Sequence, residues 1–215
     1  MKKNSVKKPK ILVLYHSLYG HVHIMADAVA HGVEMAGGEP VLRQVEGLIP
    51  RNLWNAPIKA AKEEMKKIPI ADPETALLGI DGIVVGSPTH FGIMSAQMKI
   101  FWDQTSGALL KGVLNGKPAG VFGSSAMQHG GNEMVLISMI ITLLHHGCLI
   151  VGLPFEDKIG NGGLRIADEV SGGSFYGAST ISGPLGERLP SKNELMLARV
   201  LGQKVTLAAA KLMVK

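Results

Sequence analysis

Three short segments combine hydroxyl, histidine and glycine residues in a pattern that suits a phosphorylated, planar ligand. The first, Ser17–Val22, offers hydroxyls, a glycine that permits close backbone approach, and the free N–H groups of a helix start. These groups suit a single phosphate, although a serine-capped helix without a ligand would have the same residues. The segment contains no Lys or Arg, so backbone donors and the helix dipole would have to neutralise the phosphate.

The other two segments also follow apolar runs. Ser87–Gly92 places an imidazole and the ring of Phe91 where a planar ligand could stack, although a single aromatic residue there is more often ordinary packing. Ser124–Glu133 is rich in small polar residues and leads into a helix, which turn chemistry alone would also explain. Three such loops at successive strand ends are a stronger indication of a site than any one of them.

Other histidines and the cysteine give weaker indications. His145 and His146 end an apolar helix, where they could either interact with the helix terminus or contact a ligand. His16, His21 and His23 have no acidic or cysteine ligand at a useful spacing, so we expect no metal site. Cys148 opens an apolar strand and is expected to be an inert core thiol.

Several common nucleotide and hydrolase motifs are missing from the sequence. No G-x-G-x-x-G follows the first apolar run, no P-loop is present, and no G-x-S-x-G elbow occurs. A dinucleotide site of the Rossmann type, a nucleoside triphosphatase and an α/β-hydrolase therefore lose support.

The loops need a scaffold, and the apolar pattern predicts one. Apolar runs predict five strands, at residues 11–15, 41–45, 82–86, 118–123 and 148–153. Helical spacing predicts helices over about 22–33, 94–102 and 133–144, and a last helix with the stripe Ala198, Leu201, Val205, Ala208 and Leu212. Residues 49–72 are expected to form an irregular insertion with a short helix, and residues 154–190 a Gly/Ser-rich loop.

Alternation of apolar strands with helices predicts an α/β fold. The five strands would form one doubly wound parallel sheet with helices on both faces, and its ligand would lie beyond the carboxyl ends of the strands. The three candidate loops all follow such ends. The chain of 215 residues is long enough for one domain with its own core, which we assign to residues 10–215.

The net charge comes from one end of the chain. The formal charge is +5, and the first ten residues hold five lysines and no acid, so the remainder is electrically balanced. We expect residues 1–9 to be a disordered basic tail and expect no nucleic-acid partner. The apolar stretch Met134–Phe155 is interrupted at His145–Gly147, so we predict no integral membrane segment, and no signal peptide is evident. The single cysteine favours a reducing compartment, and we expect a cytoplasmic protein.

Taken in order, the motifs resemble those of one family. The segments that carry the resemblance are Ser17-x-Tyr19-Gly20-His21-Val22, Ser87-Pro88-Thr89-x-Phe91-Gly92, Gln128-His129-Gly130-Gly131-x-Glu133, His145-His146-Gly147 and Gly172-Gly173-Ser174-x-Tyr176-Gly177-Ala178-Ser179-Thr180-Ile181. Together they resemble the WrbA family, the flavodoxin-like NAD(P)H:quinone oxidoreductases named for Trp-repressor binding. The resemblance runs from Lys10 to the C-terminus.

The resemblance implies a flavodoxin-like fold, bound FMN, NADH or NADPH as co-substrate, a quinone substrate and a homotetramer. Ser17–Val22 would hold the FMN phosphate, Thr89–Phe91 and Ser124–Gly130 would line the isoalloxazine, and Tyr19 would also meet the nicotinamide cofactor. The implied cofactor-binding residues are Ser17, Leu18, Tyr19, Gly20, His21, Val22, Thr89, His90, Phe91, Ser124, Ser125, Ala126, Met127, Gln128, His129, Gly130 and His145.

His145 would contact the flavin at a subunit boundary and is the candidate catalytic residue that helps to protonate or hydrogen-bond the reduced quinone. The chain departs from the family pattern at three positions. The family often has Arg where this chain has His90, Trp near Leu109 and Pro where Phe175 stands. The change at Leu109 bears on the shape of the substrate pocket.

Two other functions remain open from the sequence. A flavodoxin-type one-electron carrier would have a similar sheet and phosphate loop, although such carriers usually dock through an acidic surface and this one is neutral. A non-catalytic flavin-binding or scaffold protein is the other alternative. For an enzyme that gives both substrates the same face of the flavin in turn, ping-pong kinetics are expected.

The helix at 133–144 bears on assembly. It is apolar on nearly every side, with only Ser138 and Thr142 as polar breaks after Glu133. A helix that covers a sheet needs only one apolar stripe, so the remaining surface predicts contact with another subunit. Burial under the chain's own loop at 154–190 is the alternative.

Overall fold

A computed structural model describes residues 7–154, 164 and 169–213 of the chain. The strands are β1 (Lys10–Tyr15), β2 (Glu39–Gln44), β3 (Gly82–His90), β4 (Ile93–Met94), β5 (Pro118–Ser125), β6 (Leu149–Ile150) and β7 (Ala178–Ile181). The helices are α1 (His21–Met35), a 3-10 turn (Arg51–Leu53), α2 (Ala56–Met65), α3 (Ala96–Asp103), α4 (Ser106–Leu110), α5 (Asn132–His145) and α6 (Lys192–Met213). Most of the predicted basic tail, residues 1–6, lies outside the described residues.

The sheet is parallel and doubly wound, as the alternating pattern predicts. Its order is β2-β1-β3-β5-β6, with β4 paired antiparallel to β3 and β7 parallel to β5. β1 lies at the centre of the early strands, because Tyr15 is aligned with Gln44 of β2 on one side and with Gly86 of β3 on the other. The chain therefore turns in opposite directions on the two sides of β1, where a doubly wound sheet carries its ligand.

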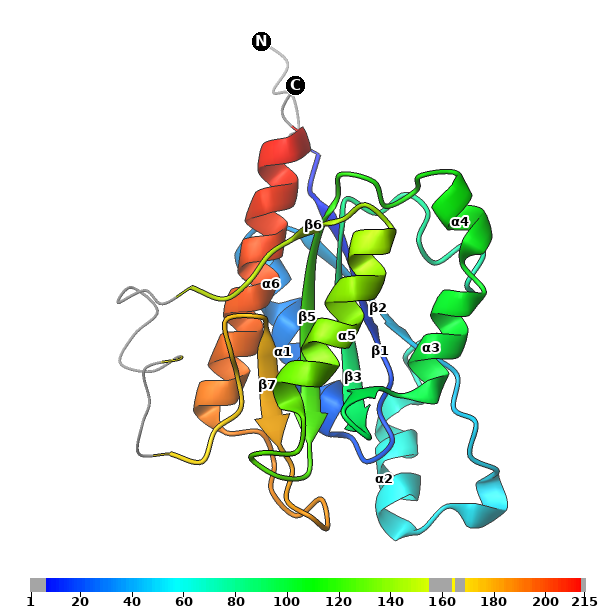
Figure 1. Cartoon of the computed structure of the whole chain (residues 1–215), viewed down its shortest axis with the longest axis vertical. Coiled ribbons are helices and arrows are strands. Elements are labelled where there is room, and N and C mark those ends of the chain that lie inside the picture. The colour runs from blue at the N-terminus through cyan, green and yellow to red at the C-terminus, as the bar shows by residue number, and fades with distance from the viewer. Residues whose placement is uncertain (1–6, 155–163, 165–168, 214–215) are drawn as a thin grey trace.

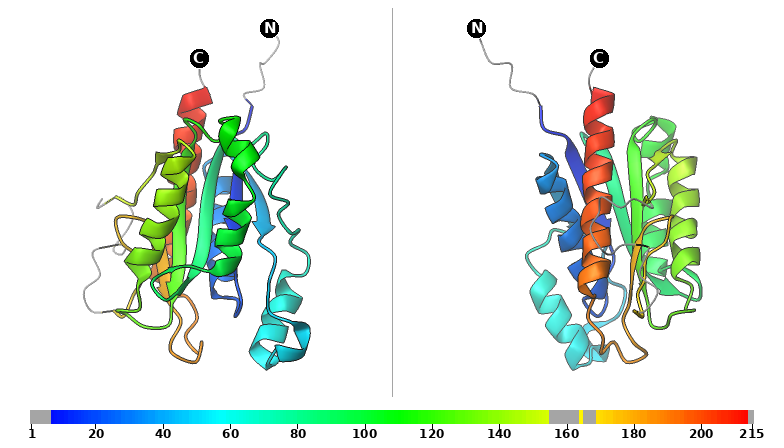
Figure 2. Two further views of the ribbon diagram at one scale, coloured as in Figure 1. Left: turned by 45° about the vertical axis from the view of Figure 1, so that its right-hand side comes forward. Right: turned by 90° about the vertical axis from the view of Figure 1, so that its left-hand side faces the viewer.

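Helices cover both faces of the sheet (Figures 1 and 2). On one face, α1 and α6 pack on side chains such as Val13 and Phe122. On the other face, α3 and α5 pack on Leu14 and Val85. β-strand side chains alternate between these two cores, so an apolar run such as Ile11–Tyr15 is buried on both sides.

The α1–α6 packing depends on glycine. A Cβ at Gly202 would overlap the carbonyl oxygen of Val29, and one at Gly32 would overlap that of Arg199. The two helices can therefore approach backbone to backbone. Of the predicted stripe on α6, Ala198, Leu201 and Val205 are fully buried, whereas Ala208 is half-buried and Leu212 is exposed, so the stripe was predicted too long.

Two strand predictions were wrong in extent. The third strand continues four residues beyond Gly86 and forms a hairpin with β4, so Ser87–His90 is strand rather than loop, and Met94 belongs to β4 rather than to a helix. The predicted fifth strand at 148–153 is reduced to Leu149–Ile150. The same edge of β5 pairs with β6 at Pro118–Ala119 and with β7 at Phe122–Ser125.

The fifth position of the sheet is therefore filled by two short pieces that are distant in the sequence. β7 falls inside the stretch that was predicted to be loop. Its sequence, Ala-Ser-Thr-Ile, has little apolar character, yet all four residues are buried. Apolar periodicity misses a strand whose buried hydroxyls are satisfied by hydrogen bonds.

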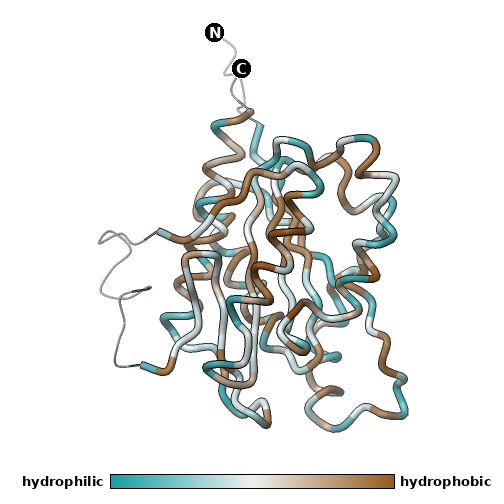
Figure 3. Tube along the Cα trace, viewed as in Figure 1, coloured by the Kyte–Doolittle hydropathy of each residue, from teal (hydrophilic) through white to brown (hydrophobic). Residues whose placement is uncertain are grey.

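Helix α5 keeps apolar residues exposed, as predicted. Figure 3 shows that most of the helix is hydrophobic. Val135, Leu136, Met139 and Leu143 are buried against the sheet, whereas Met134, Ile141 and Leu144 are each more than half exposed. Much of the segment proposed to cover them lies outside the described residues. Among the helices in the described part of the chain, none combines the length and apolarity needed to cross a bilayer.

A buried carboxylate connects β7, α6 and the loop between them. Glu194 is fully buried, and its oxygens accept hydrogen bonds from the backbone N–H groups of Gly172, Ile181 and Ser191 at 2.7–3.1 Å. The Thr180 hydroxyl donates at 2.9 Å, and Arg188 Nη1 lies 2.9 Å from Oε2. Ser191 Oγ in turn accepts from the Glu194 N–H, which completes a capping box at the start of α6.

We expect Glu194→Gln to destabilise the fold strongly, because the amide NH2 would face donors and Arg188 would lose its nearer counter-ion, keeping only Glu169 at 3.9 Å. The free energy of unfolding should fall by about 3 kcal/mol, which lowers the melting temperature by roughly 6–12 °C for a chain of this size. Thermal unfolding followed by circular dichroism measures the change. Glu34→Gln, an exposed position on α1, is the matched control and should unfold within about 2 °C of the parent. Equal melting temperatures for the two variants would contradict the role of Glu194.

Candidate functional site

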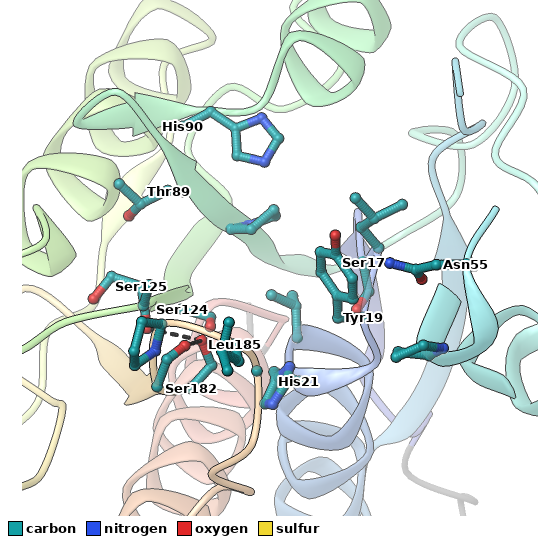
Figure 4. A pocket seen from close by; sticks show the side chains of 18 residues that line it. Ser17, Tyr19, His21, Asn55, Thr89, His90, Ser124, Ser125, Ser182 and Leu185 are labelled. Atoms are coloured by element: carbon teal, nitrogen blue, oxygen red, sulfur yellow. Dashed lines mark hydrogen bonds between the residues drawn. The ribbon is translucent and has the colours of Figure 1, made fainter. Parts of the chain in front are cut away.

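A cavity of about 370 Å³ lies at the carboxyl ends of the parallel strands. Its size falls in the range of small-molecule sites. Figure 4 shows its side chains around one opening between β1, β3, β5 and the loop that follows β7. The lining residues are Ser17, Leu18, Tyr19, His21, Val22, Asn55, Pro57, Pro88, Thr89, His90, Ser124, Ser125, Ala126, Ser182, Gly183, Pro184, Leu185 and Gly186. The structure thus brings together residues from all three predicted loops.

The loop between β1 and α1 forms the first wall. Gly20 is the N-cap of α1 with φ 94°, a left-handed conformation that glycine adopts without strain. No side chain caps α1, although the Ser17 hydroxyl accepts a hydrogen bond from the Gly20 N–H at 3.2 Å. The first N–H groups of α1 are thus left for a ligand or solvent, with the positive end of the helix dipole beside them. This geometry excludes the alternative of a conventional serine-capped helix.

The β3–β4 hairpin forms the second wall. Thr89 and His90 are the last residues of β3, and Phe91 and Gly92 form a two-residue turn with φ values of 53° and 88°. Positive φ at both positions is typical of a type I′ turn. Phe91 is fully exposed and does not line the cavity of its own chain, so ordinary core packing, the alternative to a flavin contact, does not apply to it.

The carboxyl end of β5 and the loop after β7 form the third wall. Ser124 and Ser125 are buried at the end of β5. The Ser182 N–H and hydroxyl both donate to the Ser125 carbonyl, at 2.8 and 3.2 Å, and this contact fixes residues 182–186 against the cavity. This loop, together with Asn55 and Pro57 near the start of α2, carries no motif that predicts a site role. The Ser-Gly-Pro sequence after β7 is typical of a turn. It could be assigned to the site only if the preceding residues, β7, were first recognised as a strand of the sheet.

Two buried histidines lie beside the cavity and are neutral. His21 lines it, and burial lowers its pKa below the usual value, while Nε2 has no partner among the described residues. His16 is 1% exposed, and neither ring nitrogen has a described partner. Burial, together with the charges of Lys62 and His90, lowers the pKa of His16 to about 3. At neutral pH neither ring contributes a positive charge to the site.

The remaining predicted residues after β5 lie elsewhere. Gln128 and His129 line a separate cavity of about 480 Å³ with the start of α5 and Ser171–Gly173. Met127 is 61% exposed, and Gly130 donates its N–H to the Met127 carbonyl at 2.9 Å. In this chain the segment therefore contributes Ser124–Ala126 to the main cavity and not Met127–Gly130.

His145 and Leu109 do not reach the cavity of their own chain. α5 begins beside the cavity and extends over 14 residues, about 20 Å, to His145. Figure 1 places the far end of α5 and α4, which contains Leu109, at the opposite end of the molecule from the carboxyl ends of the strands. Gly116 donates to the Gly147 carbonyl at 2.8 Å, which puts this end of α5 beside the start of β5.

The two neighbouring histidines differ in environment. His145 is exposed, whereas His146 is buried against Trp102, with ring centroids 5.1 Å apart, and its Nε2 is 3.3 Å from the Thr105 hydroxyl. Burial also lowers the pKa of His146. His146 is a structural residue, and His145 is available for contact with another molecule.

The other predictions for His and Cys can be placed as well. The described residues contain no group of three or more His, Cys, Asp or Glu side chains arranged to hold a metal ion. His23 is instead 2.9 Å from the Tyr15 hydroxyl and 3.6 Å from Asp27. Cys148 is buried, and burial raises the pKa of its thiol to about 12, as expected for an inert core cysteine.

Comparison with known proteins agrees with the motifs. Residues 9–155 match the family model of NADPH-dependent FMN reductase. Two proteins named NAD(P)H dehydrogenase (quinone), from Geobacter sulfurreducens and Chromohalobacter salexigens, are 49% and 47% identical over 204 residues, covering 94% of this chain and 98% of theirs. The crystal structure of a WrbA-like flavodoxin from Agrobacterium tumefaciens superposes with a TM-score of 0.64 at 24% identity, over 95% of this chain and 99% of that one.

The structural match shows the flavodoxin-like fold, and the sequence matches are close enough to show the family. The resemblance to the WrbA family is thereby confirmed. Nearly half of the aligned residues are identical over almost the whole length of the relatives, so the chain belongs to the NAD(P)H dehydrogenase (quinone) family.

Proposed function

We propose that the chain is an FMN-dependent NAD(P)H:quinone oxidoreductase that works in the cytoplasm as a homotetramer. The observation that carries the proposal is the single cavity in which the uncapped start of α1 meets the ends of β3 and β5. Membership of the NAD(P)H dehydrogenase (quinone) family supports the reaction, and it favours an enzyme over an electron carrier or a scaffold. The free, buried Cys148 is compatible with a reducing compartment.

The residues present fit FMN. Its phosphate matches the unpaired N–H groups at the start of α1 and the backbone approach that Gly20 permits. The hydroxyls of Ser124 and Thr89, on adjacent strands, suit the polar edge of a flavin or its ribityl chain. When bound, FMN supplies two-electron redox chemistry that takes hydride from a nicotinamide and delivers reducing equivalents to a quinone.

The side chains of the cavity position the reactants and do not take part in covalent chemistry. Tyr19 is 47% exposed at the rim, where it can contact the nicotinamide co-substrate or the quinone. The loop at 182–186 and the end of β3 limit the access of water from two sides. Hydride transfer requires alignment more than a general base, so no buried base is needed. A proton for the product would come from outside the chain's own cavity.

His145 is our candidate proton donor, and we infer that it would come from another subunit. It lies about 20 Å along α5 from the cavity of its own chain. The exposed apolar residues of α5, Met134, Ile141 and Leu144, provide a surface through which subunits can associate. Leu109 would reach a neighbouring site in the same way, as a wall of the quinone pocket.

The first prediction tests the reaction. Purified protein should be yellow, and the released cofactor should have the mass of FMN, because the site has one phosphate loop and no pyrophosphate fingerprint. Anaerobic NADH or NADPH should bleach the visible absorption within the mixing time, and a quinone should restore it. Steady-state rates should give parallel lines in double-reciprocal plots, as in ping-pong kinetics. FAD at full occupancy, or colour that neither nicotinamide changes, would refute the proposal.

The second prediction tests the phosphate loop. Gly20→Val should abolish flavin binding, because a β-branched residue is strained at a φ of 94° and would displace the loop from the phosphate. Gly37→Val is the matched control, since Gly37 also has a positive φ of 81° but lies in open space after α1. Both variants should fold by circular dichroism, and only Gly37→Val should purify yellow. A folded, yellow Gly20→Val protein would exclude this loop from the site.

The third prediction tests the shared site. His145→Ala should lower quinone turnover about 100-fold, as expected for the loss of a positioned acid. Light scattering should report a tetramer rather than a 22.8 kDa monomer. Mixing His145→Ala with flavin-free Gly20→Val, followed by dissociation and reassembly, should restore activity, because a Gly20→Val chain can donate His145 to a neighbour that binds FMN. A fully active monomer, or no recovery in mixed tetramers that retain flavin, would count against the shared site.

A further inference from the structure

Lys62 is a half-buried cation on α2 that directly contacts the loop between β1 and α1. Its Nζ donates a hydrogen bond to the Ser17 carbonyl oxygen at 3.1 Å, across 45 positions of sequence. Burial lowers its pKa below the ordinary value for lysine. The loop itself contains no Lys or Arg, and α2 is the element that brings one to it.

The ammonium group of Lys62 has no counter-ion in the part of the chain that the structure describes. Among the described residues, no carboxylate lies within ion-pairing distance of it, and the neighbouring Glu63 pairs with Lys66 instead. Partly buried charges are usually paired, since their desolvation is unfavourable otherwise. His16 and His21, the nearby buried imidazoles, are neutral at pH 7, as their lowered pKa values require. The positive charge near this wall therefore comes from Lys62, and no carboxylate among the described residues neutralises it.

The hydrogen bond also sets the direction of a backbone donor. In a trans peptide the C=O and the following N–H point in opposite directions. When Lys62 holds the Ser17 carbonyl on its own side of the loop, the Leu18 N–H must point away from Lys62. Lys62 does not line the cavity, whereas Ser17 and Leu18 do. Lys62 therefore orients the loop from the side that faces away from the cavity.

We propose that Lys62 is a positioning residue for the FMN phosphate: it orients the Ser17–Leu18 peptide and supplies the positive charge that the phosphate loop lacks. The inference rests on the proposed binding of FMN and adds the origin of its phosphate selectivity. Lys62 acts through the loop and through space, while the backbone N–H groups of the loop make the direct contacts. It should affect ligands that carry a phosphate and leave others almost unchanged.

The experiment compares FMN with riboflavin, which has the same ring and ribityl chain without the phosphate. Flavin is removed from the full-length protein, and binding is measured by quenching of flavin fluorescence. Lys62→Met should weaken FMN binding about 10- to 100-fold, the effect of losing a hydrogen bond and a charge near an anion, and should change riboflavin binding less than about twofold. Lys59→Met, an exposed position one turn earlier on α2, should leave both affinities unchanged.

Salt provides a second readout. The FMN affinity of the parent protein should fall more steeply with ionic strength than that of Lys62→Met, because screening weakens the interaction that the variant already lacks. Where Lys62→Met has a reduced folded fraction, Lys62→Gln is used, since it removes the charge and retains a polar end group.

The possible outcomes separate this inference from the proposed function. A parent protein that binds neither flavin would refute the proposed function. A parent that prefers FMN, with neutral variants that keep the same preference, would refute the role of Lys62 alone. An equal loss of FMN and riboflavin affinity would also refute it, because a general structural role of α2 would then explain the effect.

Discussion

The arrangement of the cavity depends on one buried carboxylate that lies outside it. Glu194 lies in the first turn of α6 and accepts hydrogen bonds from β7, from Gly172 and from Arg188 in the loop between β7 and α6. Arg188 also donates to the Ile181 carbonyl at 2.6 Å, at the point where the chain leaves β7 for the cavity. Because Glu194 is fully buried, loss of Arg188 would leave its carboxylate without the cation that pairs with it. The short strand β7, which is apolar only at its ends, is held by this network as much as by its pairing with β5.

Local patterns in the sequence were sufficient for much of the fold and for part of the site. Apolar runs located β1, β3 and β5, and their alternation with helices gave the parallel sheet. Loops that follow such strands are determined locally, so Ser17–Val22 and Ser124–Ala126 were placed correctly beside the cavity. β7, the loop at 182–186 and Lys62 were missed, because each takes part through contacts with residues distant in the sequence. Hydrophobic periodicity does not report such long-range contacts. Ser and Thr are also common in loops, so the buried Ser-Thr pair of β7 has the composition expected of a loop.

The length of α5 explains why one chain holds only part of the predicted site. A helix of 14 residues that starts at the carboxyl edge of the sheet must end near its amino edge, and no loop rearrangement can bring its two ends together. Motifs at both ends of α5 can contribute to one site only if the C-terminal end of α5 in one subunit lies beside the cavity of another subunit. A closed, symmetric assembly meets this condition, since each chain then both gives and receives the same contact.

The segments next to residues that line the cavity have further features that are unfavourable in an isolated chain. Phe91 has a φ of 53°, which is uncommon for a bulky residue, and its ring is fully exposed. Ile93, in the same hairpin, and Met127, after β5, are also more than half exposed. A strained backbone and exposed apolar side chains are retained where a partner or a ligand compensates for them. A subunit that packed on this hairpin would bury these side chains, and its assembly would then be coupled to formation of the proposed site.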